Sequence, residues 1–302
     1  MAKNIINAQT IAALNTSVSM AFNQGMGSIR NDWQIVAMEV KSSSSANIYP
    51  KLDGFRGIRE WIGDRILNRL TKSAFTILNK DFEGTVVVDR NDIEDDEIGI
   101  YQPLAQQLGQ DAANFPNRLV YGLLKNGAAT TGPDGQYFFD ADHLSFDING
   151  NEISASNIQT GTEPAWYLID DRKILKPIIF QNRKPFNLQT INAETDPNVF
   201  MRKEFIYGVD GRCNVGFGLW QLAYMSTAPL TPDNYAAARA AMGSLKNEKG
   251  DPLEISPTKL LVPAALESAA RQIANSELVS DGSTTISNPW KGTVEAVVVP
   301  YL

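Results

Sequence analysis

The sequence predicts an α+β fold, because helix-forming and strand-forming patterns occupy separate stretches of the chain. Residues 7–22 and residues 100–124 carry apolar side chains at the three- and four-residue steps typical of amphipathic helices. Residues 165–180 and residues 200–225 hold the densest apolar and aromatic runs, which favour sheet strands. With 302 residues, 43% of them hydrophobic, the chain is long enough for a substantial core in one or two domains.

Bulk composition excludes several classes of protein. The 27 basic and 34 acidic residues give a formal charge of -7, which disfavours binding to nucleic acid by counterion release. The one cysteine, Cys213, cannot form an internal disulfide, so an exported disulfide scaffold is excluded. The polar residues within residues 1–22 interrupt any signal-peptide core, and no apolar run approaches the ~18 residues of a membrane span. We therefore expect synthesis in the cytoplasm and no membrane partner.

The first half of the chain alternates helix and strand patterns. In residues 7–22 the helical face consists of Ile11, Leu14, Val18 and Phe22, and Gly25 and Gly27 are expected to end that helix. Residues 33–40 alternate like a strand and lead into a serine run at 42–45, expected to be a loop or the tip of a long hairpin. Residues 75–88 suggest two strands separated by residues 79–81. Pro103 suits the first turn of the long helix at 100–124.

The second half is predicted to contain short strands, turns and two shorter helices. Residues 126–163 are rich in Gly, Asp, Asn and Thr, with turns expected at 133–135 and 149–150. Thr231 and Pro232 have the cap and first-turn residues of a helix through Met242, and a second helix is expected over residues 263–275. Residues 292–302 resemble a final strand.

Residues 49–65 have the composition of a contact surface. Bulky Phe55, Trp61 and Ile62 are interleaved with side chains of both charges, which is more typical of an interface than of a core. The residues that we expect to make contacts between subunits are Arg56, Arg59, Glu60, Trp61, Asp64 and Arg65.

Two groups of side chains could in principle bind a metal ion. Carboxylates at Asp92, Glu94, Asp95, Asp96 and Glu97 could hold Mg²⁺ or Ca²⁺, but their spacing matches no loop motif, and charge at a helix start or a subunit contact is the better interpretation. Asp140, Asp142 and His143 could form a metal site or an acid–base pair of a hydrolase, but a zinc site needs more imidazole or thiolate than one histidine and a distant cysteine supply.

Other catalytic patterns are weaker still. A nucleophile pair would have to join Cys213 to His143, yet Cys213 lies in a strand-like run with nothing else to activate it. Gly216 and Gly218 faintly suggest a dinucleotide loop but lack the third glycine and a helix start, so glycines in a tight sheet are the better explanation. We therefore predict no catalytic residues, no metal, no cofactor and no enzymatic activity.

Several stretches in order make the chain similar to the Mu-like prophage major head subunit (gpT-like) family. They are residues 59–65 (REWIGDR), residues 82–101 (FEGTVVVDRNDIEDDEIGIY), Leu123-Leu124 with residues 138–143 (FFDADH), and residues 259–267 (KLLVPAALE) with Asn288-Pro289 and Gly292.

The resemblance implies a Hong Kong 97-like capsid fold. It implies an N-terminal arm at residues 1–30, an extended loop at 31–74, a peripheral domain at 75–125 and 165–226 with a spine helix at 100–124, and an axial domain at 126–164 and 227–302. Some relatives crosslink through a lysine on the extended loop. Lys51 lies in that region, but no matching asparagine or assisting acid is apparent, so we do not predict crosslinking.

The function that the resemblance implies is that of a tailed-phage major capsid protein. Hexamers and pentamers would close into an icosahedral shell that encloses double-stranded DNA without sequence-specific binding, in the virion and, during assembly, in the host cytoplasm. Implied partners are a portal and possible scaffold, protease or decoration proteins. An encapsulin-like nanocompartment is the nearest alternative, and a metal-dependent hydrolase a remote one. Charge reversal at Arg59 or Arg65 is expected to block assembly without unfolding the subunit.

Overall fold

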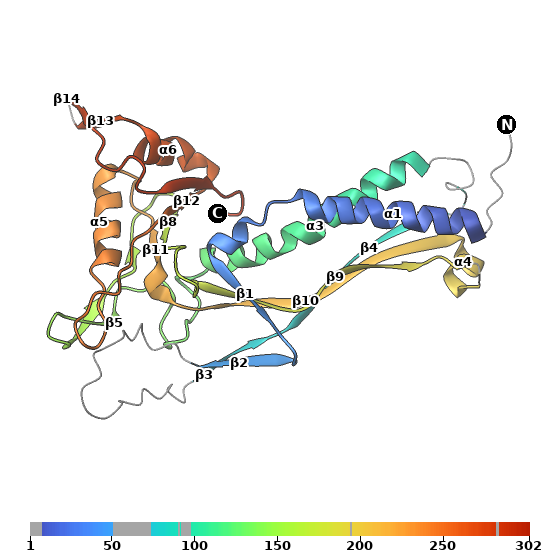
Figure 1. Cartoon of the computed structure of the whole chain (residues 1–302), viewed down its shortest axis with the longest axis horizontal. Helices are drawn as coiled ribbons and strands as arrows, with labels where there is room; N and C mark the ends of the chain where they lie inside the picture. Colours follow the sequence, from blue (N-terminus) through green and yellow to red (C-terminus); the bar gives the residue numbers. More distant parts are fainter. Residues whose placement is uncertain (1–7, 51–73, 90, 92–97, 194, 282–283) are drawn as a thin grey trace.

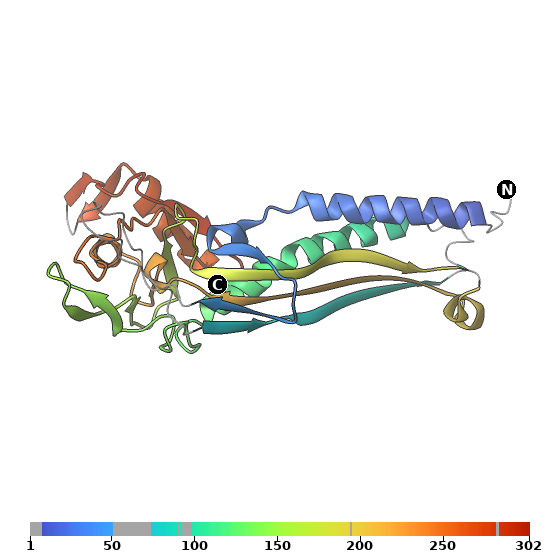
Figure 2. The same ribbon diagram turned by 60° about the horizontal axis from the view of Figure 1, so that its bottom comes forward.

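The structure is a computed structural model that describes residues 8–50, 74–89, 91, 98–193, 195–281 and 284–302. It consists of a long, narrow body of two helices on a sheet and, at one end of that body, a rounder lobe with a second sheet (Figure 1). Helices and strands coexist in both parts, so the predicted α+β class is confirmed. Figure 2 shows that the long body projects far beyond the lobe.

The long body is built on a four-stranded sheet in the order β1-β9-β10-β4. The strands are β1 (Ala37–Lys41), β9 (Ile178–Ile191), β10 (Glu204–Phe217) and β4 (Lys80–Asp89). β1 runs parallel to β9, whereas the β9–β10 and β10–β4 pairs are antiparallel. The two central strands have 14 residues each, so the sheet runs most of the length of the body.

Two helices cover one face of this sheet, α1 (Ala8–Ser28) and α3 (Ile98–Lys125). Both correspond to predicted helices. Leu14, Val18 and Phe22 on α1 are buried as expected, and they pack with Phe205 and Val209 of β10 and with their neighbours. Burying such side chains contributes roughly 1.5–3 kcal/mol each, which holds α1 on its own subunit.

The expected end of the first helix at Gly25 and Gly27 is wrong, because α1 continues through both glycines to Ser28. The reason is a close approach to α3. A Cβ atom built at Gly25 would lie 2.0 Å from the backbone oxygen of Gln106, and one built at Gly109 would lie 2.2 Å from that of Phe22. Tertiary packing therefore outweighs the poor helix propensity of glycine, about 1 kcal/mol per residue.

The predicted strand at residues 33–40 begins late. A 3-10 turn, η1 (Asp32–Ile35), precedes β1 and turns the chain from α1 onto the sheet. Asn117 on α3 accepts a hydrogen bond from the backbone N–H of Trp33 at 2.8 Å, and the Tyr121 hydroxyl donates to the Asp32 carbonyl at 3.0 Å. These contacts with α3 override the alternating pattern of residues 33–36.

A hairpin of β2 (Ala46–Pro50) and β3 (Ala74–Leu78) crosses from the edge strand β1 to the opposite edge strand β4. Asn214 on β10 donates to the carbonyl of Leu78 at 2.6 Å. Successive side chains on β10 alternate between faces, and Phe205, Tyr207 and Val209 pack with the helices and nearby strands, so the hairpin lies on the other face. β3 and β4 confirm the two strands predicted in residues 75–88.

The lobe contains a five-stranded sheet in the order β15-β12-β8-β11-β7. Its strands are β15 (Glu295–Val298), β12 (Lys259–Val262), β8 (Trp166–Ile169), β11 (Ala223–Ser226) and β7 (Ile158–Gln159). Helix α5 (Pro232–Gly243) packs against β11, and helix α6 (Glu267–Asn275) packs against β12 and β15. Thr231 caps α5 by accepting from the N–H of Asn234 at 3.3 Å, as predicted.

Short elements complete the chain. The turns predicted at 133–135 and 149–150 are confirmed, since Gly135 and Gly150 have φ of 93° and 80°. The remaining elements are β5 (His143–Phe146), β6 (Glu152–Ala155), α4 (Pro197–Arg202), η2 (Trp220–Leu222), η3 (Ala264–Leu266), β13 (Leu278–Asp281) and β14 (Thr284–Ser287). Among the described helices, none is both long and apolar enough to cross a membrane.

Each predicted strand run in the middle of the chain divides between the two sheets. Residues 165–180 supply β8 in the lobe and the start of β9 in the long body, and residues 200–225 supply β10 and then β11. The chain therefore crosses between body and lobe in both runs. One continuous apolar core cluster spans the junction and includes Trp166, Ile178, Phe217 and Trp220.

Candidate functional site

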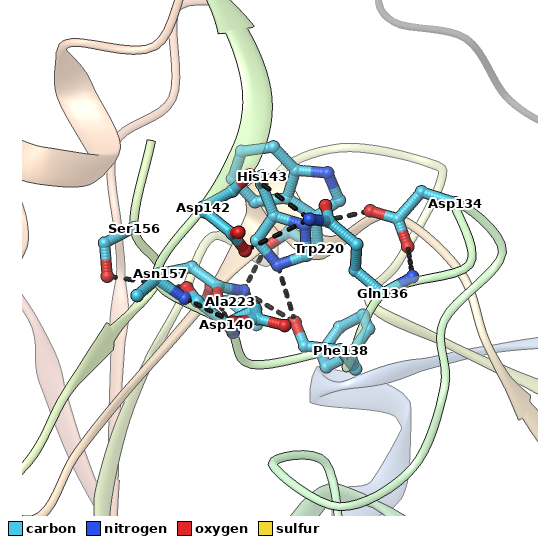
Figure 3. A network of polar contacts seen from close by, with 11 residues as sticks. Asp134, Gln136, Phe138, Asp140, Asp142, His143, Ser156, Asn157, Trp220 and Ala223 are labelled. Atoms are coloured by element: carbon cyan, nitrogen blue, oxygen red, sulfur yellow. Dashed lines mark hydrogen bonds and ion pairs between the residues drawn. The ribbon is translucent and has the colours of Figure 1, made fainter. Parts of the chain in front are cut away.

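The only histidine, His143, is fully buried and lies within a polar cluster of the lobe (Figure 3). Its Nδ1 is 2.8 Å from a carboxylate oxygen of Asp134, and its Nε2 is 3.3 Å from the carbonyl oxygen of Phe138. The imidazole stacks on Trp220 with ring centroids 4.1 Å apart and planes 9° apart. Both ring nitrogens thus have protein partners, and the ring has no face open to a substrate.

The carboxylate that pairs with His143 is not one of the two considered from the sequence. Asp142 accepts from the side chain of Gln136 at 3.0 Å, and Asp140 accepts from the N–H of Ala141 at 2.7 Å. Burial acts to raise the pKa of Asp134, but the hydrogen bond and charge of His143, together with backbone N–H groups that include that of Gln136, outweigh it and hold that pKa below its usual range. The one sequence signal for this pair is that Asp134 and His143 lie nine residues apart in a segment rich in turn residues, which can bring them together.

The buried cluster is suited to holding loops together. Asn157, also buried, donates to the carbonyl of Phe138 at 2.8 Å, and its own oxygen accepts from the N–H of Asp140 at 2.9 Å. No group of three or more His, Cys, Asp or Glu side chains that could hold a metal ion occurs within the described residues. The cluster therefore has the chemistry of a structural brace rather than of a hydrolase.

Cys213 lies on β10, and its side chain is buried. Burial raises the pKa of its thiol to about 12, so the nucleophilic thiolate is suppressed at neutral pH. His143, the partner considered for it, uses both ring nitrogens elsewhere. The interpretation of Cys213 as a structural thiol agrees with this position.

Gly216 and Gly218 serve close packing. A Cβ atom at Gly216 would lie 2.4 Å from Cδ1 of Ile77 on the hairpin, and one at Gly218 would lie 2.6 Å from the carbonyl oxygen of Lys176. Gly216 is the next-to-last residue of β10 and is followed by a 3-10 turn rather than by a phosphate-binding helix. The interpretation as glycines of a tight sheet is confirmed.

The predicted contact residues lie outside the described residues. They are Arg56, Arg59, Glu60, Trp61, Asp64 and Arg65, and the same holds for Lys51 and for the acidic residues Asp92, Glu94, Asp95, Asp96 and Glu97. The hairpin β2–β3, which is described, leads directly into residues 51–73 and leaves Ile48 72% and Leu78 64% exposed.

Large apolar side chains are also exposed at the far end of the long body, a feature that the sequence analysis missed. The short helix α4 stands at that end (Figure 1), where Phe200 is 79% and Met201 76% exposed while Val199 is buried. The pair Asp196-Pro197, a helix-start signal, could have revealed this helix. Exposed apolar groups at the extremities of a protein are typical of surfaces that meet other macromolecules.

The face of the long sheet opposite α1 and α3 carries the hairpin β2–β3 and, near the same end as α4, an apolar row. Val87 on β4, Ile206 on β10 and Ile191 on β9 lie in register across three strands. Val87 and Ile191 are 52% and 40% exposed, and alternation places the row on the face away from α1 and α3. The body thus has one face buried under its helices and one face with apolar residues left open.

Comparisons with known proteins agree on one family. The family model described as Mu-like prophage major head subunit gpT matches residues 11–302. The major capsid protein of Escherichia phage Mu is 38% identical over 304 residues, covering 99% of this chain and 100% of that protein. A chain of the procapsid of bacteriophage JBD30 is 38% identical with a TM-score of 0.87, covering 98% of this chain and 100% of that one. A chain of the bacteriophage JBD30 capsid is 29% identical with a TM-score of 0.77, covering 98% of this chain and 99% of that one.

Proposed function

Because the chain belongs to the Mu-like prophage major head subunit gpT family, we propose that its long body, its hairpin and its lobe each meet other copies in the shell. The chain is a major capsid protein of a tailed phage and has the Hong Kong 97-like fold. It assembles with other copies into a capsid shell and is located in the virion capsid. The family is one of structural proteins, and nothing in the comparisons favours the encapsulin or hydrolase alternatives.

The main support for the capsid function is the full-length match to capsid chains, and the exposed apolar groups also support it. Among the described residues, such groups occur at the hairpin β2–β3, at the tip helix α4, on the sheet face near that tip, and at the hairpin β13–β14 of the lobe, where Leu278 is 60% exposed. Neighbouring exposed apolar side chains such as Phe200 and Met201 form a patch of the kind that marks a contact between proteins. Many modest contacts per subunit can add up to a stable shell.

The finer organisation is part of the proposal. Hexamers and pentamers close an icosahedral shell around double-stranded DNA, and portal, scaffold, protease or decoration proteins act with it in the host cytoplasm. The acidic balance of the chain, -7 in formal charge, suits a container whose lining must not hold packaged DNA tightly.

The domain division is also proposed. Residues 1–30 act as the N-terminal arm and residues 31–74 as the extended loop, with α3 as the spine of the peripheral domain. Strand pairing favours a boundary that follows the sheets. Residues 166–169 and 223–226 pair with lobe strands, so they group with the axial residues 126–164 and 227–302 rather than with β9 and β10.

The contact residues give the direct test. Arg59→Glu and Arg65→Glu are each expected to abolish shells in sedimentation and negative-stain microscopy, because a reversed charge would face the partner it normally attracts. Circular dichroism and melting temperature of the subunit should stay unchanged. Arg59→Lys and Arg65→Lys, which keep the charge, are the matched controls and should still assemble. Normal shells from the Glu variants would refute the assignment of these two residues.

A further inference from the structure

A buried amide fixes the hairpin β2–β3 onto the long sheet of its own subunit. Gln181 on β9 is completely buried, although glutamine is normally a surface residue. Its Oε1 accepts from the Tyr49 hydroxyl at 2.9 Å, and its Nε2 donates to the Ile77 carbonyl at 3.1 Å and to Oδ1 of Asn79 at 2.7 Å. One side chain therefore holds β2, β3 and the residue that joins β3 to β4.

The bonds continue into the loop on the other side of the hairpin. Asn79 donates from Nδ2 to the Ser42 hydroxyl at 3.1 Å and to the Ser44 carbonyl at 2.8 Å. The Ser42 hydroxyl in turn donates to Oδ1 of Asn47 at 2.9 Å. Entry and exit of the hairpin are thus tied to each other as well as to the sheet.

An apolar contact fixes the same junction. Ile77 is buried, and its Cδ1 atom occupies the space that a side chain at Gly216 would need. In register on β9 and β10, Gln181 and Asn214 lie opposite each other, and Asn214 donates to the Leu78 carbonyl. We call the space at Gly216 that Ile77 fills the Gly216 notch. Because the hydrogen bonds around Gln181 are directional and the notch fits one side chain, together they specify one position of the hairpin on the sheet, whereas an apolar contact alone would let the hairpin slide along the sheet.

We propose that Gln181 is a positioning residue for assembly: with Asn79 and the Gly216 notch it sets the direction in which the hairpin β2–β3 leaves the subunit, and so the angle at which it reaches a neighbouring copy. This inference rests on the proposed role of the extended loop in shell contacts. Ile48 and Leu78, the exposed apolar residues of the hairpin, are then presented in one fixed direction.

Gln181→Met in the full-length chain tests this role, since methionine keeps the length of the side chain and removes its hydrogen bonds. In the unassembled subunit, hydrogen–deuterium exchange in peptides covering residues 42–50 and 74–79 should become at least about tenfold faster, while residues 204–213 keep their wild-type rate. Under assembly conditions the variant should give open sheets or shells of mixed diameter. Gln189→Met, on the exposed part of the same strand, is the matched control and should behave as wild type.

Tyr49→Phe provides a milder second variant, because it removes one hydrogen bond at a half-buried position and keeps the ring that stacks on Phe75. It should accelerate exchange in the same two peptides by a smaller factor. Unchanged exchange in both variants would overturn the anchoring, and faster exchange with uniform normal shells would overturn the positioning role. Failure of the wild-type chain to form shells would instead count against the proposed function, so the two failures are distinguishable.

Discussion

At the scale of single residues, the groups with the most reactive chemistry are used to hold the lobe and the sheet together. The only histidine stacks on Trp220 between a carboxylate and a carbonyl, and the only cysteine is buried in a central strand. The sequence was sufficient to argue against catalysis at both, because neither had a plausible set of partners. It could not identify Asp134 as the partner of His143, since that pairing depends on how residues 131–143 turn in space.

Cys213 is expected to be unreactive in the folded protein. Burial raises the pKa of its thiol to about 12, so almost no thiolate exists at pH 8, and the sulfur is not accessible to reagents in solution. A thiol-specific reagent should label the native subunit only at the rate of unfolding, and should label one thiol per chain at once in concentrated urea. Fast stoichiometric labelling without denaturant would contradict the buried position.

Asp134 is expected to make the stability of the lobe sensitive to acid. Its pKa is lowered in the folded state, so its contribution is fully present above the unfolded pKa of about 3.9 and is lost as the pH falls through the lower folded value. Asp134→Asn should destabilise the subunit at pH 7 by about 1–3 kcal/mol. The difference in melting temperature between the two proteins should shrink as the pH falls below about 3.9, and a difference that stays constant on acidification would exclude this role.

At the scale of elements, the sequence was reliable where a periodic apolar face was long, and less so where tertiary contacts decide. Both long helices, the two strands of residues 75–88 and the capped helix after Thr231 were predicted. The end of α1 was not, because Gly25, a residue type that often stops a helix, is needed where α1 packs against α3. The division of two strand runs between two sheets was not predictable either, since local propensity says nothing about which sheet a strand joins.

The crossing of α1 and α3 can be tested with alanine substitutions at matched glycines. Gly25→Ala and Gly109→Ala each place a Cβ atom against the backbone of the other helix and should destabilise the subunit by about 1–3 kcal/mol. Gly27→Ala and Gly122→Ala, in the same two helices, have no neighbour within 4 Å and should be neutral or stabilising by up to about 1 kcal/mol. Thermal melts of the four unassembled variants give the comparison, and equal losses at all four positions would show that helix packing is not the cause.

At the scale of the whole molecule, the architecture is that of a part rather than of a self-sufficient globule. A long body with an exposed apolar row on its sheet, a tip helix with Phe200 and Met201 exposed, and the hairpin β2–β3 extend away from the main core. The fold class and the role in a shell could be predicted from the sequence, through the family resemblance and the lack of a catalytic constellation. The tip and the open apolar row could not, because exposure depends on the finished fold.

These surfaces are expected to bind other copies of the same chain. Negative-stain electron microscopy of the purified full-length protein, over a series of salt and protein concentrations, tests it most directly. Closed shells of regular size are expected, or sheets and rings of hexamers and pentamers where closure fails. A chain that remains monomeric and well folded under every condition would rule out this role.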